Sequence, residues 1–188
     1  WSSDVCSSDL RYRAGRDKMH AKFVAILQEA APSLQRDMAD TYAITEKHIG
    51  YRFGTMQELV AALTHTGNLS NKSKMTVGGR GKNHRWARYN EETGEIDFAP
   101  WDNMVQELVA AGILTKQHFD TAQKIWDLNA EMLPDIQRTY RERYGSFFDE
   151  VKPEAFTITF PDGTEATYAG GYVPAKTDRD LEIGRAHV

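Results

Sequence analysis

The sequence predicts a mainly α-helical fold (α+β at most): a helical bundle with one long kinked helix and two small β-hairpins. Apolar side chains recur every three or four residues through most of the chain, as on one face of an amphipathic helix. The longest such stretch covers about 116–144, where Pro134 should kink the helix. Two segments, near 85–98 and 156–169, instead alternate around turn residues, which is typical of hairpins.

The first helices of the bundle are expected within residues 16–67. Residues 17–31 place their apolar side chains on one helical face, and Pro32 should break or kink this helix. Ser33 can then cap a second helix over about 34–48.

A third helix is expected after Thr55, because Thr55 and Glu58 have the spacing of a capping box and an apolar stripe follows them. Gly67 and Asn68 are favourable residues for ending this helix. Residues 68–84 then lack a sustained apolar period and contain three glycines. They predict a mobile, basic, glycine-rich loop.

The hairpin at 85–98 has two possible registers. It consists of two short alternating runs around the sequence NEETG. One register pairs Trp86 with Phe98, whereas a shift by one residue pairs Arg88 with Asp97. The sequence leaves both registers open.

Residues 101–145 are expected to form a helical hairpin. Gly112 should end the first of its helices, Thr115 can cap the long second helix, and Gly145 should end it. The apolar stripes of all these helices predict a common core, which is expected to contain Phe23, Ile26, Leu59, Leu63, Val105, Leu108, Phe119, Trp126, Leu133 and Tyr140.

The two ends of the chain resemble translated sequencing adapter rather than protein. WSSDVCSSDL (1–10) looks like no folding element, and IGRAHV (183–188) resembles the partner adapter. Both are expected to be non-native tails that pack against nothing, flanking one natural domain over 11–181 cut from a longer protein. Without the tails the chain has no cysteine, because Cys6 is its only one. Disulfides, thiol catalysis and Cys-ligated zinc are then not expected.

The composition argues against several other classes of function. No run approaches the roughly 18 consecutive apolar residues that a membrane span needs, so no membrane partner is expected. GGRGK at 78–82 fails as a phosphate loop, since Thr76 and Asn83 occupy the places of the required glycine and hydroxyl residue. The histidines have no metal-ligand spacing such as HExxH. No catalytic residue, cofactor or metal site is predicted.

One segment stands out by its charge. Between Asn71 and Tyr89 the chain has six Lys or Arg and no acid, although its net charge is −4. Flexible cations beside flat rings suit contact with a nucleic-acid backbone. This interpretation assigns binding to Lys72, Lys74, Arg80, Lys82, Arg85, Trp86 and Arg88. Alternatively, the cations pair with the acids of 91–97 while Trp86 lies in the core, or the segment contacts a protein.

Four further segments carry a family resemblance over roughly 63–176. They are LTHTGNLSNKSKM, GGRG, FDTAQKIWDLNAEMLPDIQRTYRERYGSFFDEV and AGGYVPA. Together they resemble an unnamed module of the giant polyvalent proteins of tailed bacteriophages and prophages. The resemblance implies a location in the virion or the host bacterial cytoplasm, and it implies no catalytic residues.

Two functions are therefore expected as alternatives. The first is a non-catalytic structural or interaction module, whose partners are other domains of the same longer chain and DNA or another polyanion. The second is part of an enzyme whose active site is completed by neighbouring domains. Thr64, His65 and Asn68 would then form the lip of its pocket, with His84 close to His65.

Overall fold

The computed structural model describes the backbone of residues 2–77 and 86–174, and the side chains of residues 15–77 and 86–174. Six helices and two antiparallel two-stranded sheets make up these ranges, which confirms the mainly α-helical class with two hairpins. In chain order they are α1 (Ser2–Leu34), α2 (Ala39–Ile49), α3 (Met56–Thr64), α4 (Leu69–Thr76), β1 (Arg88–Tyr89), β2 (Ile96–Asp97), α5 (Ala99–Ala110), α6 (Lys116–Tyr144), β3 (Phe156–Thr159) and β4 (Glu165–Tyr168).

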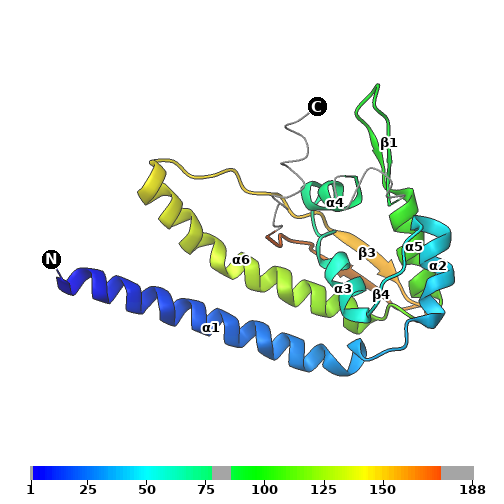
Figure 1. Cartoon of the computed structure of the whole chain (residues 1–188), viewed down its shortest axis with the longest axis horizontal. Coiled ribbons are helices and arrows are strands. Elements are labelled where there is room, and N and C mark those ends of the chain that lie inside the picture. Colours follow the sequence, from blue (N-terminus) through cyan, green and yellow to red (C-terminus); the bar gives the residue numbers. More distant parts are fainter. Residues whose placement is uncertain (1, 78–85, 175–188) are drawn as a thin grey trace.

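The two longest helices, α1 and α6, extend together from one side of the remaining elements (Figure 1). They run antiparallel, since Lys124 of α6 pairs with Glu29 of α1 and, further out, Glu131 pairs with Lys22. We call residues 15–27 and 128–144 the arm, and the rest of the described chain the head. The two helices separate toward their outer ends (Figure 1).

Helix α1 continues past Pro32, so the predicted break there is wrong. A proline removes one hydrogen bond and crowds the carbonyl four residues earlier, but here it lies in the last turn, two residues before the helix ends, so few helical residues follow it. The Ser33 hydroxyl donates to the Ala30 carbonyl oxygen at 2.7 Å instead of capping a following helix. Helix α2 begins later than expected, where the Asp37 carboxylate accepts the Ala39 N–H at 2.9 Å.

The expectation that 1–10 contains no folding element is also wrong for the backbone, because residues 2–10 form the outer turns of α1. The side chains of 2–14, Trp1 and residues 183–188 lie outside the described residues. The expectation that these tails pack against nothing therefore stays a prediction.

Helix α3 begins as predicted, and α4 replaces part of the predicted loop. The Thr55 hydroxyl accepts the Glu58 N–H at 3.1 Å, which caps α3. The Asn68 side chain, expected to end a helix, accepts the Asn71 N–H at 2.8 Å and caps α4. Helix α4 was not predicted, because it has too few apolar residues to show a helical period in the sequence. The N-cap at Asn68 defines where it begins.

The connection from α5 to α6 and the end of α6 agree with the prediction. Gly112 has φ +67°, and the N–H of Ile113 reaches back to the Leu108 carbonyl at 2.9 Å, as in a Schellman motif. Helix α6 follows Thr115, runs through Pro134 without ending, and stops at Gly145, which has φ +77°.

Both hairpins form where the sequence predicts them. In the first, Arg88 lies opposite Asp97, so the shifted register is the one adopted. In the second, strands β3 and β4 pair along their whole length, from Phe156 opposite Tyr168 to Thr159 opposite Glu165. This second sheet covers α6, with the Tyr168 ring stacked 5.6 Å from that of Phe119.

The core lies in the head, around Phe53, Trp101, Phe119 and Trp126. Six predicted core residues are buried there: Leu59, Leu63, Val105, Leu108, Phe119 and Trp126. Four others are not fully buried, and the prediction is wrong for them: Phe23, Ile26, Leu133 and Tyr140. All four lie on or beside the arm, where α1 and α6 have fewer neighbours to cover them.

Candidate functional site

The basic segment 71–89 is divided between the head core and its surface. The Lys72 ammonium lies 2.7 Å from the Asp102 carboxylate and 4.7 Å from the centre of the Phe98 ring. Its side chain is only 17% exposed, so Lys72 ties α4 to the start of α5. Lys74, two residues later, is exposed. Arg80, Lys82 and Arg85 lie outside the described residues.

Trp86 is part of the core, in agreement with the alternative interpretation of this segment. Its ring stacks on Trp101 at 5.4 Å, and the rings of Tyr51 and Phe53 approach it at 5.2 and 5.6 Å. A ring enclosed in this way has no open face on which a nucleic-acid base could stack.

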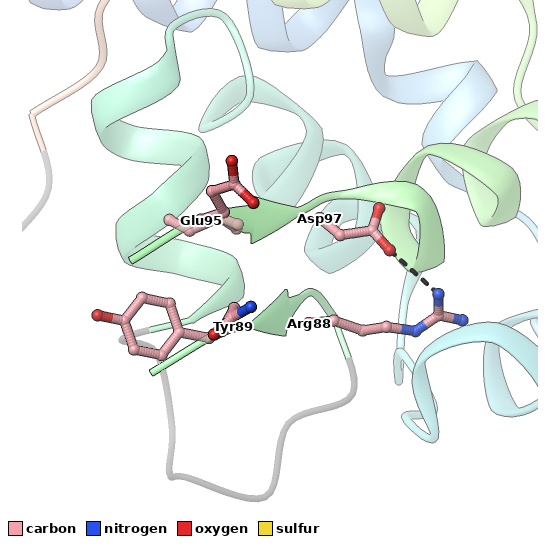
Figure 2. Close-up of a pocket in the computed structure, with 6 residues that line it drawn as sticks. Arg88, Tyr89, Glu95 and Asp97 are labelled. Carbon is pink, nitrogen blue, oxygen red and sulfur yellow. Dashed lines mark hydrogen bonds and ion pairs between the residues drawn. The ribbon is translucent and has the colours of Figure 1, made fainter. Parts of the chain in front are cut away.

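Arg88 and Tyr89 are exposed and form strand β1 of the first hairpin (Figure 2). The Arg88 side chain is 77% exposed, and its guanidinium lies 3.0 Å from the Asp97 carboxylate. The Tyr89 ring projects away from this ion pair, and Glu95 directly precedes the neighbouring strand β2 (Figure 2). Together with Asn90 and Ile96 these residues line a shallow depression. Acidic side chains therefore accompany the cations on this hairpin.

Two of the residues proposed as a pocket lip, Thr64 and Asn68, make hydrogen bonds between distant parts of the head. The Thr64 carbonyl accepts the indole N–H of Trp126 at 2.8 Å. Asn68 is fully buried and donates to the Gly171 carbonyl at 2.9 Å while capping α4. Burial lowers the pKa of His65, which ends α3. His84 lies outside the described residues, so its distance to His65 stays untested.

Two segments far apart in the chain meet at this point because Gly67 and Gly171 let their backbones approach Trp126. The Gly171 N–H donates to the Gly67 carbonyl at 2.8 Å. A Cβ atom on Gly67 would lie 2.5 Å from the Trp126 ring, and one on Gly171 would overlap the Trp126 side chain. The Asn71 amide extends the junction by donating to the Val173 carbonyl at 2.7 Å. We call this arrangement the glycine junction.

The arm carries apolar side chains on faces that are covered only near the head. On α1, Phe23 lies two turns before Ala30 on the same face, yet Phe23 is 38% exposed and Ala30 is 1% exposed. On α6, Ile136 lies three turns after Ile125 on the same face, yet Ile136 is 48% exposed and Ile125 is 9% exposed. The same stripe that forms the core in the head thus reaches solvent along the arm.

One side of the outer α6 is covered by the chain that returns from its end. Gln137 is buried, and its amide accepts the Phe148 N–H at 3.1 Å and donates to the Phe148 carbonyl at 2.9 Å. The Phe148 ring packs against Tyr140 at 5.4 Å. Since successive helical residues are about 100° apart, Ile136 lies beside this covered side, and its side chain is exposed.

A wide depression of about 570 Å³ adjoins the return of the chain, lined by Leu133, Pro134, Gln137, Phe147, Phe148, Asp149 and Glu150. The arm therefore combines an apolar stripe with a hollow at its outer end. Sequence reasoning assigned the arm residues to the core and missed this surface. The length of α6 was the available signal: 29 residues span about 43 Å, more than a small head can cover.

The described residues contain no group of three or more His, Asp or Glu side chains that could hold a metal ion. None of the helices in the described ranges is long and apolar enough to cross a membrane. No family model, curated protein or solved structure matches this chain.

Proposed function

We propose that this chain is a non-catalytic interaction module, and that it contacts its partner through the apolar stripe of the arm. The observation that carries the proposal is that apolar side chains on one helical face become exposed along the arm. On α6 the change is from buried Ile125 to exposed Ile136, and on α1 it is from buried Ala30 to exposed Phe23. Contiguous apolar side chains left in water are costly, and such surfaces are typical of protein–protein contact sites.

The proposed setting is a longer polyvalent protein of a tailed bacteriophage, in the virion or in the host cytoplasm. It rests on the resemblance of the segments between 63 and 176. Other domains of that protein, or proteins that travel with it, are the proposed partners.

Site-specific photo-crosslinking tests the proposal. A photoreactive amino acid replaces Ile136 on the arm or, as the control, Leu69, which is equally exposed but lies on α4 of the head. In cells that produce the chain from its native genomic context, we expect crosslinks to another polypeptide segment at position 136 and few at position 69. Equal yields at the two positions, or none at 136, would contradict the proposal.

Contact with nucleic acid is a second candidate function. The exposure of Lys74, Arg88 and Tyr89 favours it, since a ring and two cations are accessible on one segment. Fluorescence anisotropy with single-stranded and duplex DNA should then show salt-sensitive binding that falls when Lys74 and Arg88 are both replaced by alanine. Lys72→Ala is not a clean probe, because Lys72 is tied to Asp102. Absence of binding at low salt would remove this candidate.

A further inference from the structure

We infer that the depression of about 570 Å³ beside the return of the chain binds a partner peptide in which an apolar side chain lies next to Lys or Arg. We call this depression the outer hollow. Ile136 does not line it, so the inference goes beyond the proposed function and does not rest on it. It follows from the apolar lining of the outer hollow, from its exposure and from its charge.

The apolar lining comes from two segments that are held against each other. Two residues of α6 and two of the returning chain contribute to it: Leu133, Pro134, Phe147 and Phe148. The Gln137 amide fixes Phe148 by bonding both its N–H and its carbonyl oxygen. The outer hollow is therefore formed without a partner, and binding does not have to order its lining first.

Large apolar side chains are exposed in this part of the chain more than elsewhere in the described residues. Of nine such side chains, four lie within the short range 136–151: Ile136, Tyr144, Phe147 and Val151. A concentration of exposed apolar side chains is typical of a contact site, whereas single ones are ordinary surface. The lining of the outer hollow thus belongs to the most apolar part of the described surface.

The polar part of the lining sets the charge of the peptide. It contains the carboxylates of Asp149 and Glu150, and none of the lining residues is Lys or Arg. Among the described residues the Asp149 carboxylate has no hydrogen bond or ion pair, and Glu150 accepts the Gln137 amide at 3.0 Å. A Lys or Arg next to the apolar anchor would supply the cation that these two carboxylates lack.

The nearby cations of the chain do not neutralise this acidic lining. Arg138 pairs with Asp135 at 2.8 Å. The Arg141 guanidinium lies over the Phe147 ring, 5.0 Å from its centre. Lys152 is exposed and forms no ion pair with any described residue. None of these three cations lines the outer hollow, so its carboxylates are available to a cation of the partner.

The same features argue against other classes of ligand. Two carboxylates would repel the phosphates of a nucleic acid or of an anionic lipid. Phe147 and Asp149 are exposed, so the outer hollow is open and does not enclose a small molecule as a deep cleft does. A peptide matches both parts of the lining, because it can present an apolar side chain and a cation side by side.

Three short synthetic peptides with a fluorescent label test the inference. The first has a central Leu-Trp pair flanked by lysines, the second has glutamates in place of the lysines, and the third has Gly-Ser in place of the Leu-Trp pair. By fluorescence anisotropy with the 188-residue chain, we expect the first to bind at least about tenfold more tightly than either of the others. Its binding should weaken as the salt concentration rises.

Two pairs of variants locate the binding. Asp149→Lys should reduce the affinity for the first peptide about tenfold or more, whereas Glu91→Lys makes the same charge change at an exposed position of the first hairpin and should have less than about a twofold effect. Phe147→Ala should reduce it about fivefold or more, whereas Tyr89→Ala removes an exposed ring of the same hairpin and should leave it unchanged. Circular dichroism checks that all four variants are folded.

Equal affinity for the lysine and glutamate peptides would overturn the inference, and so would equal effects of Asp149→Lys and Glu91→Lys. Absence of binding by the first peptide at about 1 mM would also overturn it. Sedimentation that shows a dimer dispersed by Phe147→Ala would overturn it in favour of a second copy of this chain. The crosslinking test at position 136 is read separately, because Ile136 does not line the outer hollow.

Discussion

The imidazole of His118 joins the inner ends of the two long helices by donating from Nε2 to the Ser33 carbonyl oxygen at 3.0 Å. Its other nitrogen, Nδ1, accepts the Thr115 N–H at 3.0 Å at the start of α6. One ring thus caps α6 and ties it to the end of α1. Only the neutral tautomer with its proton on Nε2 can make both bonds.

We predict that protonation of His118 weakens the junction between α1 and α6. Burial lowers the pKa of His118 below the ordinary value of 6.5, because the ring is enclosed. The unfolded chain therefore binds a proton more readily than the folded chain. The contribution of neutral His118 to the free energy of unfolding is fully present above pH 6.5. It is lost as the pH falls from 6.5 through the lowered pKa of His118.

Urea denaturation at pH 7 and pH 5 measures this effect. We expect His118→Ala to lower the free energy of unfolding at pH 7 by about 2–4 kcal/mol, through a cavity and two lost hydrogen bonds. The loss should be smaller at pH 5. His20→Ala, at an exposed position, serves as the control. His65 also has a pKa lowered by burial, so only the difference between wild type and variant reports on His118. A loss that is the same at both pH values would contradict the prediction.

Adding one methyl group at the glycine junction should destabilise the head. In Gly171→Ala the new Cβ would overlap Trp126, and neither backbone nor ring can move freely there. We expect a loss of about 1–3 kcal/mol in thermal or urea unfolding. Gly15→Ala provides the matched control, because nothing lies within 4 Å of its added Cβ. At that helical position alanine should be neutral or stabilising by up to about 1 kcal/mol.

Two lysines on α4 should differ in their effect on stability. Lys72→Ala removes an ion pair to Asp102 and a contact with the Phe98 ring, and we expect a cost of about 1–2 kcal/mol. Lys74→Ala removes an exposed side chain and should change the free energy of unfolding by less than about 0.5 kcal/mol. Equal costs for the two variants in urea unfolding would show that Lys72 does not tie α4 to α5.

The return of the chain along α6 should open when Gln137 is replaced by alanine. Gln137 makes hydrogen bonds with both the N–H and the carbonyl of Phe148, and none of them survives in Gln137→Ala. Hydrogen exchange should then accelerate at the Phe148 amide, while exchange in the head stays unchanged. Gln117→Ala is a suitable control on the same helix, since Gln117 is exposed. Unchanged protection at Phe148 would contradict this prediction.

Features with a local cause could be predicted from the sequence, and features with a distant cause could not. Thr115 and Gly145 marked the ends of α6 because caps depend on neighbouring residues. Helix α4 was missed, since it has too few apolar residues to show a helical period and is held in place by Asp102 and Val173, far along the chain. The break predicted at Pro32 was wrong because a proline in the last turn of a helix has few following residues to disrupt.

The same distinction between local and distant causes applies to the candidate site. Amphipathic spacing assigned Phe23 to the inner face of its helix, and that assignment agrees with its position seven residues before Ala30. Spacing says nothing of whether another element covers that face, so the open stripe of the arm required the tertiary structure. For Trp86, spacing likewise does not distinguish a ring available to a nucleic acid from a ring in the core, because its burial depends on Trp101 of a later helix.

The glycine junction also constrains the order in which the chain can fold during synthesis. One of the two hydrogen bonds of the Asn68 side chain is to Gly171, more than a hundred residues later in the chain. The Gly67 carbonyl likewise accepts the N–H groups of Glu154 and Gly171, which are synthesised long after it. Local helices can form as they leave the ribosome, but long-range contacts close only when both partners have emerged. The glycine junction around Trp126 therefore forms late, and a nascent chain that stops before Gly171 lacks the backbone that packs on the Trp126 side chain.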